Sequence, residues 1–445
     1  MSETARNSPA PAPPREPTGP SLAEATEDYA AERVPETGRR STWAITFVRM
    51  GFTVSATDLL YGIALGLYFP FWTGLFIALG ASVLIAGFAI LTGLIGQREG
   101  ITTALAMKLT FGREGTRLPA LVIALLSAGF VGYSTGITAA VLPAADDLGL
   151  LYCVVLSIMY TALSIVGFDK GLTWVGRISV PLMIVMVLIA TVAAVSHAGG
   201  WAGIVEAEPA QAGALTVMAM LGLGVNKWMT GATVSPDITR FAKGPKAVYT
   251  TTLAEFIVGN FGFNLLGIVI GLGVGVADLG TAFTIIGVGA LATVAIFVQG
   301  FPHEVNNAYA ASLAGRTALG LPRIHVNILI GVIAAALAYY GLSQGILSSF
   351  LSYLGYLGYA IPLVPGILIA DYFIVRRGRY RLQLDEVGAV NWRAMIAFFG
   401  GLAINLFLGL VVGDSLWHVL PLTGMLLSLI VSPREVRAAW AAPRG

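Results

Sequence analysis

Charge is what this sequence lacks most. Only 11% of its 445 residues are Asp, Glu, Lys or Arg, whereas 56% are hydrophobic and the mean hydropathy is +0.80. Soluble domains carry roughly 25% charged residues, so this composition excludes an ordinary soluble protein. Apolar stretches recur along the whole chain and place it in a lipid bilayer. The net charge of +2 gives no indication of a nucleic-acid partner.

Cysteine and nucleotide-binding motifs are nearly absent as well. Cys153 is the single cysteine, so no internal disulfide can form, and we expect it to be a small buried residue. Neither Cys nor His occurs at metal-ligand spacing, which argues against a structural zinc site. Glycine-rich strings such as "GFVGYSTG" lack the Lys-Ser/Thr ending of a phosphate-binding loop. We therefore expect no cofactor and no enzymatic activity.

What is present is a series of apolar segments. A membrane-spanning helix needs about 20 apolar residues, and twelve segments of the chain qualify. The candidates are residues 44–69, 72–96, 117–143, 148–167, 172–196, 213–234, 248–276, 280–311, 323–341, 344–372, 392–411 and 415–432. Residues 1–40 have no apolar signal segment and are rich in Pro, Glu, Ser and Ala, which predicts a disordered cytoplasmic tail.

The loops between these segments differ in charge. One set of loops holds Arg39, Arg40, Arg98, Lys108, Arg113, Arg117, Lys170, Arg177, Arg240, Lys243, Lys246, Arg316, Arg323 and the run "RRGRYR" at 376–381. The alternate set holds Asp146, Asp147, Glu206, Glu208, Asp278 and Asp414. Because cytoplasmic loops carry the excess of Lys and Arg, we expect both termini to be cytoplasmic. An even number of spans agrees with that orientation.

Two segments are polar in the middle. Residues 48–66, "VRMGFTVSATDLLYGIALG", hold a cluster that includes Ser55 and Asp58, and residues 218–241, "MAMLGLGVNKWMTGATVSPDITRF", hold Lys227 and Thr230. They are the first helices of two successive five-span units, which have opposite orientation. Such inverted repeats place the substrate at the bilayer midplane between interrupted helices. Small residues in these segments are equally typical of close helix packing.

Asp58, Lys227 and Glu304 are ionisable residues at membrane depth. Each costs roughly 2.5 to 3.5 kcal/mol on insertion scales, so pairing or function must offset that cost. A purely structural pair of Lys227 with Asp58 or with Glu304 is the alternative to a functional role. The stretch "VQGFPHEVNNAYAASL" at 298–313 adds His303 and Asn307 beside Glu304.

Three motifs carry a resemblance to a known family: "SPDITRF" at 235–241, "NNAYAASL" at 306–313 and "PLVPGILIADYFIVRR" at 362–377. Over about residues 40 to 432 the chain resembles the nucleobase:cation symporter-1 family, closest to its cytosine and purine permease branch. The resemblance implies an all-α integral membrane protein of twelve helices. Ten would form a LeuT-like five-plus-five inverted repeat, and two would follow at the C-terminus.

The resulting domain prediction has five parts. They are the tail at 1–40, a transport core of ten helices at 41–373, a cytoplasmic loop at 374–391, two helices at 392–432 and a cytoplasmic C-terminal tail at 433–445.

The resemblance also implies substrate-binding residues. In the family, an aromatic residue from the third helix and one from the sixth sandwich a flat ring, and Phe130 and Trp228 match those positions. Ser127 stands where the cytosine branch has a glutamine that reads the ring edge, and Lys227 stands where that branch has a serine. Asn307 matches an amide near the substrate. We add Thr230 and His303 to this set. Lys227 and Ser127 argue against a plain cytosine site.

The coupling ion follows from the eighth helix. Sodium-coupled members bind the ion with two adjacent hydroxyl residues and with carbonyl groups that match Gly51, Val54 and Gly300. His303 and Glu304 replace the hydroxyl pair here. A carboxylate is still a suitable sodium ligand, but a group that accepts a proton can take the ion's place. We therefore predict proton coupling with Glu304 as carrier and Asp58 or His303 as helper, with Na⁺ as the alternative ion.

The sequence thus predicts a secondary transporter in the plasma membrane, surrounded by lipid and acting as a monomer. Its expected cargo is a purine, a pyrimidine or a similar heteroaromatic compound carried with protons. A sodium-coupled symporter of a vitamin-like heterocycle is the alternative. A membrane-embedded enzyme using Asp58, His303 and Glu304, and a channel, are the competing classes.

Overall fold

The computed structural model describes residues 32–166, 169–380, 386–413 and 422–433, with the side chains of residues 47, 166 and 169–177 excepted. The described elements are η1 (Glu36–Gly38), α2 (Thr42–Thr53), α3 (Ala56–Tyr68), α4 (Phe71–Glu99), α5 (Thr103–Phe111), α6 (Arg117–Ala140), α7 (Ala145–Val166), α8 (Asp169–His197), α9 (Trp201–Glu206), α10 (Val217–Lys227), α11 (Met229–Thr233), α12 (Ser235–Thr239), α13 (Pro245–Leu253), η2 (Ala254–Asn260), α14 (Phe261–Val274), α15 (Leu279–Ile285), α16 (Gly289–Leu319), α17 (Arg323–Gln344), α18 (Ile346–Ala360), α19 (Leu363–Ile369), η3 (Ala370–Val375), α20 (Trp392–Val411) and α21 (Leu422–Ile430). The all-α prediction is confirmed for the described residues, whose only β interaction is an isolated bridge between Arg40 and Ala242.

Among the described residues, fewer helices than the twelve predicted spans are long and apolar enough to cross a membrane. Within the described residues, eight helices are long and apolar enough to cross a membrane, or nine if the bent pair α2 and α3 forms one span. The segment 213–234 divides into the short helices α10 and α11, and 280–311 divides into α15 and α16, whose centre is polar. In 415–432 the described helix is only α21, because 414–421 lie outside the described residues. The count of twelve therefore stays a prediction.

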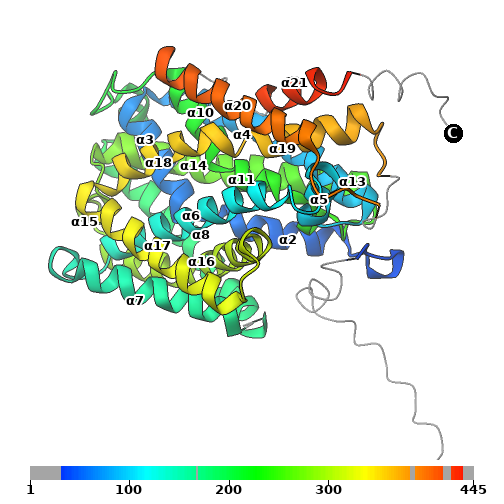
Figure 1. Cartoon of the computed structure of the whole chain (residues 1–445). Helices are drawn as coiled ribbons and strands as arrows, with labels where there is room; N and C mark the ends of the chain where they lie inside the picture. Colours follow the sequence, from blue (N-terminus) through cyan, green and yellow to red (C-terminus); the bar gives the residue numbers. More distant parts are fainter. Residues whose placement is uncertain (1–31, 167–168, 381–385, 414–421, 434–445) are drawn as a thin grey trace, which may run out of the picture.

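The helices lie side by side, with α20 and α21 along one edge of the bundle and α7 along the opposite edge (Figure 1). Inside the bundle α3 packs against α14, and α6 packs against α16 and α17. Glycine makes the first of these contacts close. A Cβ added at Gly267 would lie 2.6 Å from the carbonyl oxygen of Leu59 and 2.8 Å from Cα of Gly62. Small residues let membrane helices approach to backbone contact in this way.

Residues 32–40 correct part of the tail prediction. Instead of being disordered, this segment lies across the ends of α4 and α12. The side chain of Arg39 donates to the carbonyl groups of Gln97 at 2.9 Å and Arg240 at 2.6 Å, and the amide of Val34 donates to Gly100 at 2.8 Å. The segment is polar, and these carbonyl groups at helix ends provide the partners that a composition argument does not see. Residues 1–31 lie outside the described part.

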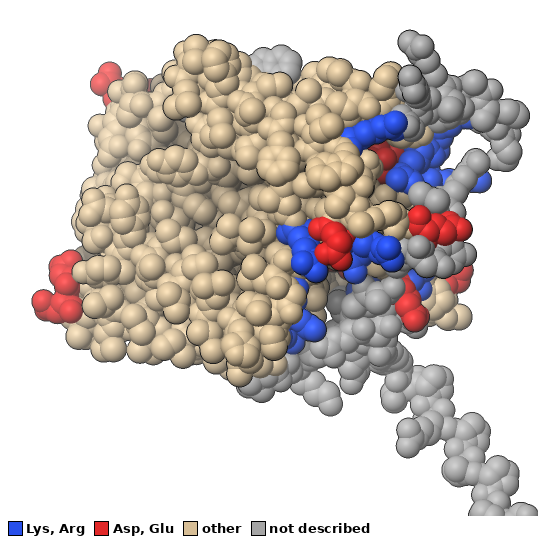
Figure 2. All heavy atoms as spheres, viewed as in Figure 1, with Lys and Arg blue, Asp and Glu red and all other residues tan. Residues whose placement is uncertain are grey.

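Charge is distributed as the loop pattern predicts. Figure 2 shows the lysine and arginine side chains of this face gathered at one end of the molecule, whereas only acidic side chains appear at the opposite end. The side chains of Lys170 and Arg177, and residue Asp414, lie outside the description. We call the Lys- and Arg-bearing end the basic end. Its placement on the cytoplasmic side stays a prediction.

Candidate functional site

The candidate site begins where the first long segment is interrupted. α2 ends at Thr53 and α3 begins at Ala56, and the two helix axes differ in direction by 55°. Ser55 is in an extended conformation and caps α3, because its hydroxyl oxygen accepts the backbone N–H of Asp58 at 3.2 Å. Serine is among the preferred N-cap residues, so a polar cluster inside an apolar run ends one helix and starts another. Asp58 thereby lies in the first turn of α3, fully buried.

A second interruption faces the first. α10 ends at Lys227, and Trp228, with φ −108° and ψ 6°, separates it from α11. Lys227 Nζ lies 2.5 Å from Asp58 Oδ1, and both side chains are at most 2% exposed. Trp228 Nε1 donates to the same oxygen at 2.9 Å, and the Ser55 hydroxyl donates to Asp58 Oδ2 at 2.8 Å. Of the two partners that the sequence left open for Lys227, the structure selects Asp58 and not Glu304.

An amide chain holds Lys227 from the other side. Lys227 Nζ donates to Asn264 Oδ1 at 3.0 Å, Asn264 Nδ2 donates to Asn260 Oδ1 at 3.2 Å, and Asn260 Nδ2 donates to Ser82 Oγ at 2.9 Å. These four residues come from α10, α14, η2 and α4, and all are at most 3% exposed. The ring of Tyr61, 4.4 Å from Lys227 Nζ, covers the ammonium group. Buried networks of this kind fix the orientation of the charged group.

The polar centre of α16 forms the other half of the site. His303 is 6% exposed and Glu304 is fully buried, and His303 Nε2 lies 3.7 Å from Glu304 Oε1. Ser134 and Asn307 face the Glu304 carboxyl group. Within the described part of the chain, both Glu304 oxygens and His303 Nδ1 are buried without a hydrogen bond. Buried polar groups are normally paired, so these atoms are available to a proton, an ion or a ligand.

The predicted carbonyl ligands have different surroundings. The Val54 carbonyl, at the break between α2 and α3, accepts Gln299 Nε2 at 2.8 Å. Gly300 lies against Tyr160, whose hydroxyl would stand 2.5 Å from an added Cβ. Gly51 has no such neighbour within 4 Å. Of the three predicted carbonyl ligands, that of Val54 already accepts one hydrogen bond.

The predicted aromatic pair lies on neighbouring elements, because α6 packs against α11. Phe130 is half-buried and meets Tyr353 edge to face, with ring centroids 5.6 Å apart. Trp228 is also half-buried and meets Phe256 at 5.9 Å, again edge to face. Ser127 is buried on the same helix as Phe130, one turn earlier. Thr230 has a buried hydroxyl that bonds to no described residue.

Sequence reasoning missed a second buried ion pair. Arg49 and Glu255, 1% and 5% exposed, form a salt bridge in which Arg49 Nε donates to Glu255 Oε2 at 2.7 Å. Arg49 Nη1 also donates to the hydroxyl of Ser235 at 3.0 Å. The bridge joins α2 to α12 and to η2, a π-helical turn of the kind often found at functional sites. The criterion that singled out Asp58, an ionisable group at membrane depth, would have found both residues.

Comparison with known proteins gives this site a context. Residues 33–431 match a family described as permeases for cytosine/purines, uracil, thiamine and allantoin. The chain is 26% identical over 416 residues to the cytosine permease of Escherichia coli strain K12, covering 93% of this chain and 96% of that protein.

Solved structures share the fold. The inward-facing conformation of Mhp1 has a TM-score of 0.74 at 17% identity, covering 92% of this chain and 96% of that one. Mhp1 in a closed conformation with bromovinylhydantoin bound, described as a nucleobase-cation-symport-1 family transporter, has a TM-score of 0.69. A substrate-bound, outward-open Na⁺-coupled sialic acid symporter has a TM-score of 0.64 at 13% identity, covering 94% of each chain.

Proposed function

Because the chain belongs to the family of permeases for cytosine/purines, uracil, thiamine and allantoin, and is a membrane transporter rather than an enzyme, we propose that it imports a nucleobase or a related heteroaromatic compound by proton symport. One observation carries the proposal. Two interrupted helices bring Asp58, Lys227 and Trp228 into one buried cluster, where a cargo can compete for partners that the protein otherwise satisfies itself.

The proposed substrate contacts are of two kinds, stacking on the ring and hydrogen bonds to its edge. Trp228 and Phe130 stack on the ring, which is worth roughly 0.5 to 1.5 kcal/mol beyond the area buried. Lys227, Thr230, His303 and Asn307 donate to or accept from its polar edge. Ser127, shorter than a glutamine, leaves room for a substituent. The unpaired hydroxyl of Thr230 and the unpaired His303 Nδ1 support the edge contacts, since both lack a partner among the described residues.

Glu304 is the proton carrier in this scheme, and Asp58 or His303 assists it. One observation supports a proton over Na⁺. The hydroxyl pair expected for sodium is replaced by two titratable groups, His303 and Glu304. Lys227 and Asp58 form the resting pair, and a substrate carbonyl or carboxylate partly displaces Asp58 when it binds. Opening then alternates between the two sides of the membrane.

A sodium-coupled symporter of a vitamin-like heterocycle is the second candidate. It is favoured by thiamine among the compounds named for the family and by the Na⁺-coupled symporter among the structural neighbours. In both cases we propose a monomer in the plasma membrane with both termini in the cytoplasm. We also retain residues 41–373 as the transport core, with residues 374–391, 392–432 and 433–445 as loop, added helices and tail.

Uptake into vesicles containing the purified full chain tests the function. Radiolabelled purines, pyrimidines and pyridine or pyrimidine vitamins are offered with an imposed proton gradient, with a sodium gradient, or with neither. We expect one class of heterocycle to accumulate only with the proton gradient. Accumulation that needs sodium and ignores the proton gradient would select the second candidate. If none of the heterocycles moves, the substrate class is wrong.

A thermal-shift screen locates the site. A ligand that binds only the native state raises its stability in proportion to the logarithm of its concentration. We expect Trp228→Ala to abolish the shift that the transported heterocycle produces. Trp43→Ala is the matched control, because Trp43 is 79% exposed on α2 and lies outside the cluster. An unchanged shift in Trp228→Ala would remove this side chain from the site.

A further inference from the structure

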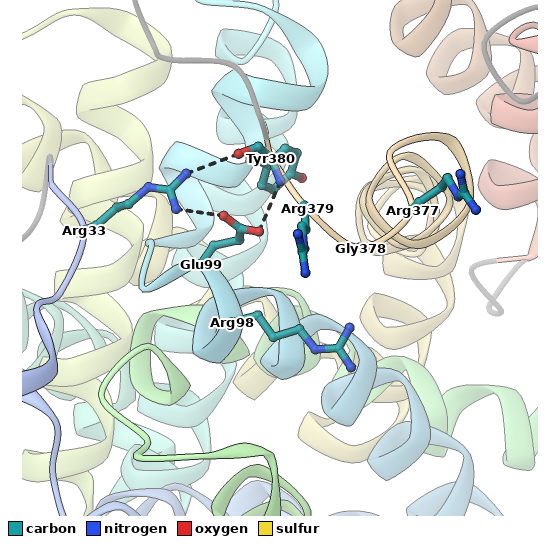
Figure 3. Close-up of a pocket in the computed structure, with 7 residues that line it drawn as sticks. All are labelled: Arg33, Arg98, Glu99, Arg377, Gly378, Arg379 and Tyr380. Carbon is teal, nitrogen blue, oxygen red and sulfur yellow. Dashed lines mark hydrogen bonds and ion pairs between the residues drawn. The ribbon is translucent and has the colours of Figure 1, made fainter. Parts of the chain in front are cut away.

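A pocket of about 790 Å³ opens at the basic end of the molecule, away from the transport site. Its lining consists of Arg33, Arg98, Glu99, Arg377, Gly378, Arg379 and Tyr380. Figure 3 shows that these residues come from three parts of the chain: the segment before α2, the end of α4 and the turn that follows η3. None of them belongs to the set that we assign to cargo or coupling ion.

The pocket carries an excess of positive charge. Four of its seven lining residues are arginines and one, Glu99, is acidic. Glu99 is 7% exposed and already engaged on both oxygens: Arg33 Nη1 lies 2.9 Å from Oε2, and Oε1 accepts Tyr380 N at 3.1 Å and the Tyr372 hydroxyl at 3.0 Å. Burial raises the pKa of the Tyr380 phenol above its usual range, so the ring adds no negative charge. The seven lining residues therefore carry a net formal charge of +3.

Hydrogen bonds and a ring contact hold the walls of the pocket in place. Arg33, fixed on Glu99, also donates to the Tyr380 carbonyl at 3.4 Å. The Arg98 guanidinium lies 5.6 Å from the centre of the Phe373 ring. Arg377 and Gly378 have positive φ values of 54° and 80°, and Gly378 N donates to the Tyr372 carbonyl at 2.7 Å. This turn folds the chain back so that Arg379 points toward Arg98, as Figure 3 shows.

The level of the pocket relative to the membrane indicates its ligand. Two helices of membrane-spanning length end at it, one at Glu99 and the other at Val375. Residues that directly follow a span lie at the level of the lipid headgroups. Guanidinium groups match phosphate oxygens in a planar, two-pronged geometry and carry a permanent charge. Scattered basic residues at span ends are explained by attraction to the negative membrane surface, whereas here four arginines line one pocket.

We propose that this pocket binds the phosphate group of an anionic phospholipid from the leaflet at the basic end. Arg98 and Arg379 hold the phosphate from opposite sides, and the ion pair of Arg33 with Glu99 forms the wall beside it. The bound lipid bridges α4 and the turn after η3. Within the described chain, Glu99 already joins these two elements.

The test uses the purified full chain in detergent. Dioleoylphosphatidylglycerol and, in a parallel series, dioleoylphosphatidylcholine are added at increasing concentrations while the unfolding temperature is recorded. The concentration dependence gives an apparent Kd for each lipid. We expect phosphatidylglycerol to stabilise the protein at concentrations where phosphatidylcholine does not. Each arginine near a membrane surface contributes about fivefold to anionic lipid affinity. Arg98→Gln combined with Arg379→Gln should therefore weaken the apparent affinity by about 25-fold.

Controls separate the pocket from general charge. Arg316→Gln removes an exposed arginine from the last turn of α16, outside the pocket, and should leave the phosphatidylglycerol affinity unchanged. Equal losses in the control and in the double variant would overturn the proposal. So would equal stabilisation by the two lipids, or a shift by inorganic phosphate at the same concentration as the lipid. Residues 1–31 hold five acidic residues and two arginines. If phosphatidylglycerol binds only after their deletion, the occupant is this segment of the chain and the proposal is wrong.

Discussion

At the residue scale, the buried charges decide which side chains depend on one another. Asp58 accepts from Lys227, Trp228 and Ser55, so its carboxylate is well satisfied without a cargo. Glu304 pairs with no Lys or Arg among the described residues, and neither of its oxygens accepts a hydrogen bond there. The two carboxylates therefore suit different tasks. Asp58 holds α3 to Lys227 and Trp228, and Glu304 is free to bind and release a proton in the proposed scheme.

The Lys227–Asp58 pair should be costly to break and inexpensive to replace. Lys227→Met leaves a buried carboxylate uncompensated, which typically costs 3 to 5 kcal/mol. We expect Lys227→Met combined with Asp58→Asn to recover more than half of that loss, because the asparagine oxygen still accepts from Trp228. Thermal unfolding of the purified variants measures both effects.

An exposed pair provides the comparison. Arg117 and Glu114 lie 2.9 Å apart with side chains 58% and 54% exposed, and Arg117→Met should cost no more than about 1 kcal/mol. If Lys227→Met proves equally mild, the buried pair does not hold the two interrupted helices together. If the double variant transports normally, Lys227 takes no part in recognising the substrate.

Glu304→Gln separates binding from coupling. Glutamine imitates the protonated acid in shape, so we expect the variant to exchange labelled for unlabelled substrate but to accumulate none against a gradient. Its exchange rate should also lose the pH dependence of the unmodified protein. Vesicle counterflow at several pH values measures both properties. Glu114→Gln, at an exposed position, should behave as the unmodified protein. Gradient-driven accumulation by Glu304→Gln would exclude Glu304 as the proton carrier.

At the element scale, helix contacts position the site. α3 carries Asp58 and α14 carries Asn264, and glycines bring these two helices to backbone contact. The salt bridge of Arg49 with Glu255 fixes α2 to η2, and Arg49 also bonds to Ser235 of α12. Arg49 thus ties α2, which precedes the first break, both to η2 and to α12, which follows the second break.

A single methyl group should disturb the contact between α3 and α14. Gly267→Ala places a Cβ against the backbone of Leu59 and Gly62, which cannot rotate away, and overpacking of this kind typically costs 1 to 3 kcal/mol. Gly262→Ala, on the same helix, meets no heavy atom within 4 Å and should be neutral or slightly stabilising. The unfolding temperatures of the two purified variants measure this difference in stability. Equal stability would mean that α3 and α14 tolerate a wider separation.

At the scale of the whole molecule, the separation of charge sets the orientation. The basic end holds the arginine pocket and the segment 32–40, and acidic side chains appear at the opposite end (Figure 2). Positively charged loops remain in the cytoplasm during insertion, so the arginine pocket should face the inner leaflet.

Cysteine labelling tests that orientation. Cys153 is the single cysteine and is fully buried, so background labelling of the folded chain should be low. Asp278 and Arg316 are both exposed, and the loop charges predict opposite sides of the membrane for them. We therefore expect a membrane-impermeant maleimide added to intact cells to label Asp278→Cys but not Arg316→Cys. Permeabilised cells should label both. The reverse pattern in intact cells would invert the topology.

The sequence by itself determined the class of protein, the interrupted helices and most of the candidate residues. These follow from local properties: hydropathy over a window, the capping preference of Ser55, and the insertion cost of Asp58, Lys227 and Glu304. The resemblance to a transporter family followed from short motifs and is confirmed by the family match. The residue roles, the coupling ion and the count of twelve helices stay predictions.

Only the tertiary structure decided which partners meet. It pairs Lys227 with Asp58 rather than with Glu304, and it pairs Arg49 with Glu255. It places Gln299 within hydrogen-bonding distance of the Val54 carbonyl. It also ordered residues 32–40 and assembled the arginine pocket from three distant segments. The physical reason is the same in each case. The sequence shows that a buried charge or an open carbonyl needs a partner, but helix packing determines which groups lie within 3 Å of it.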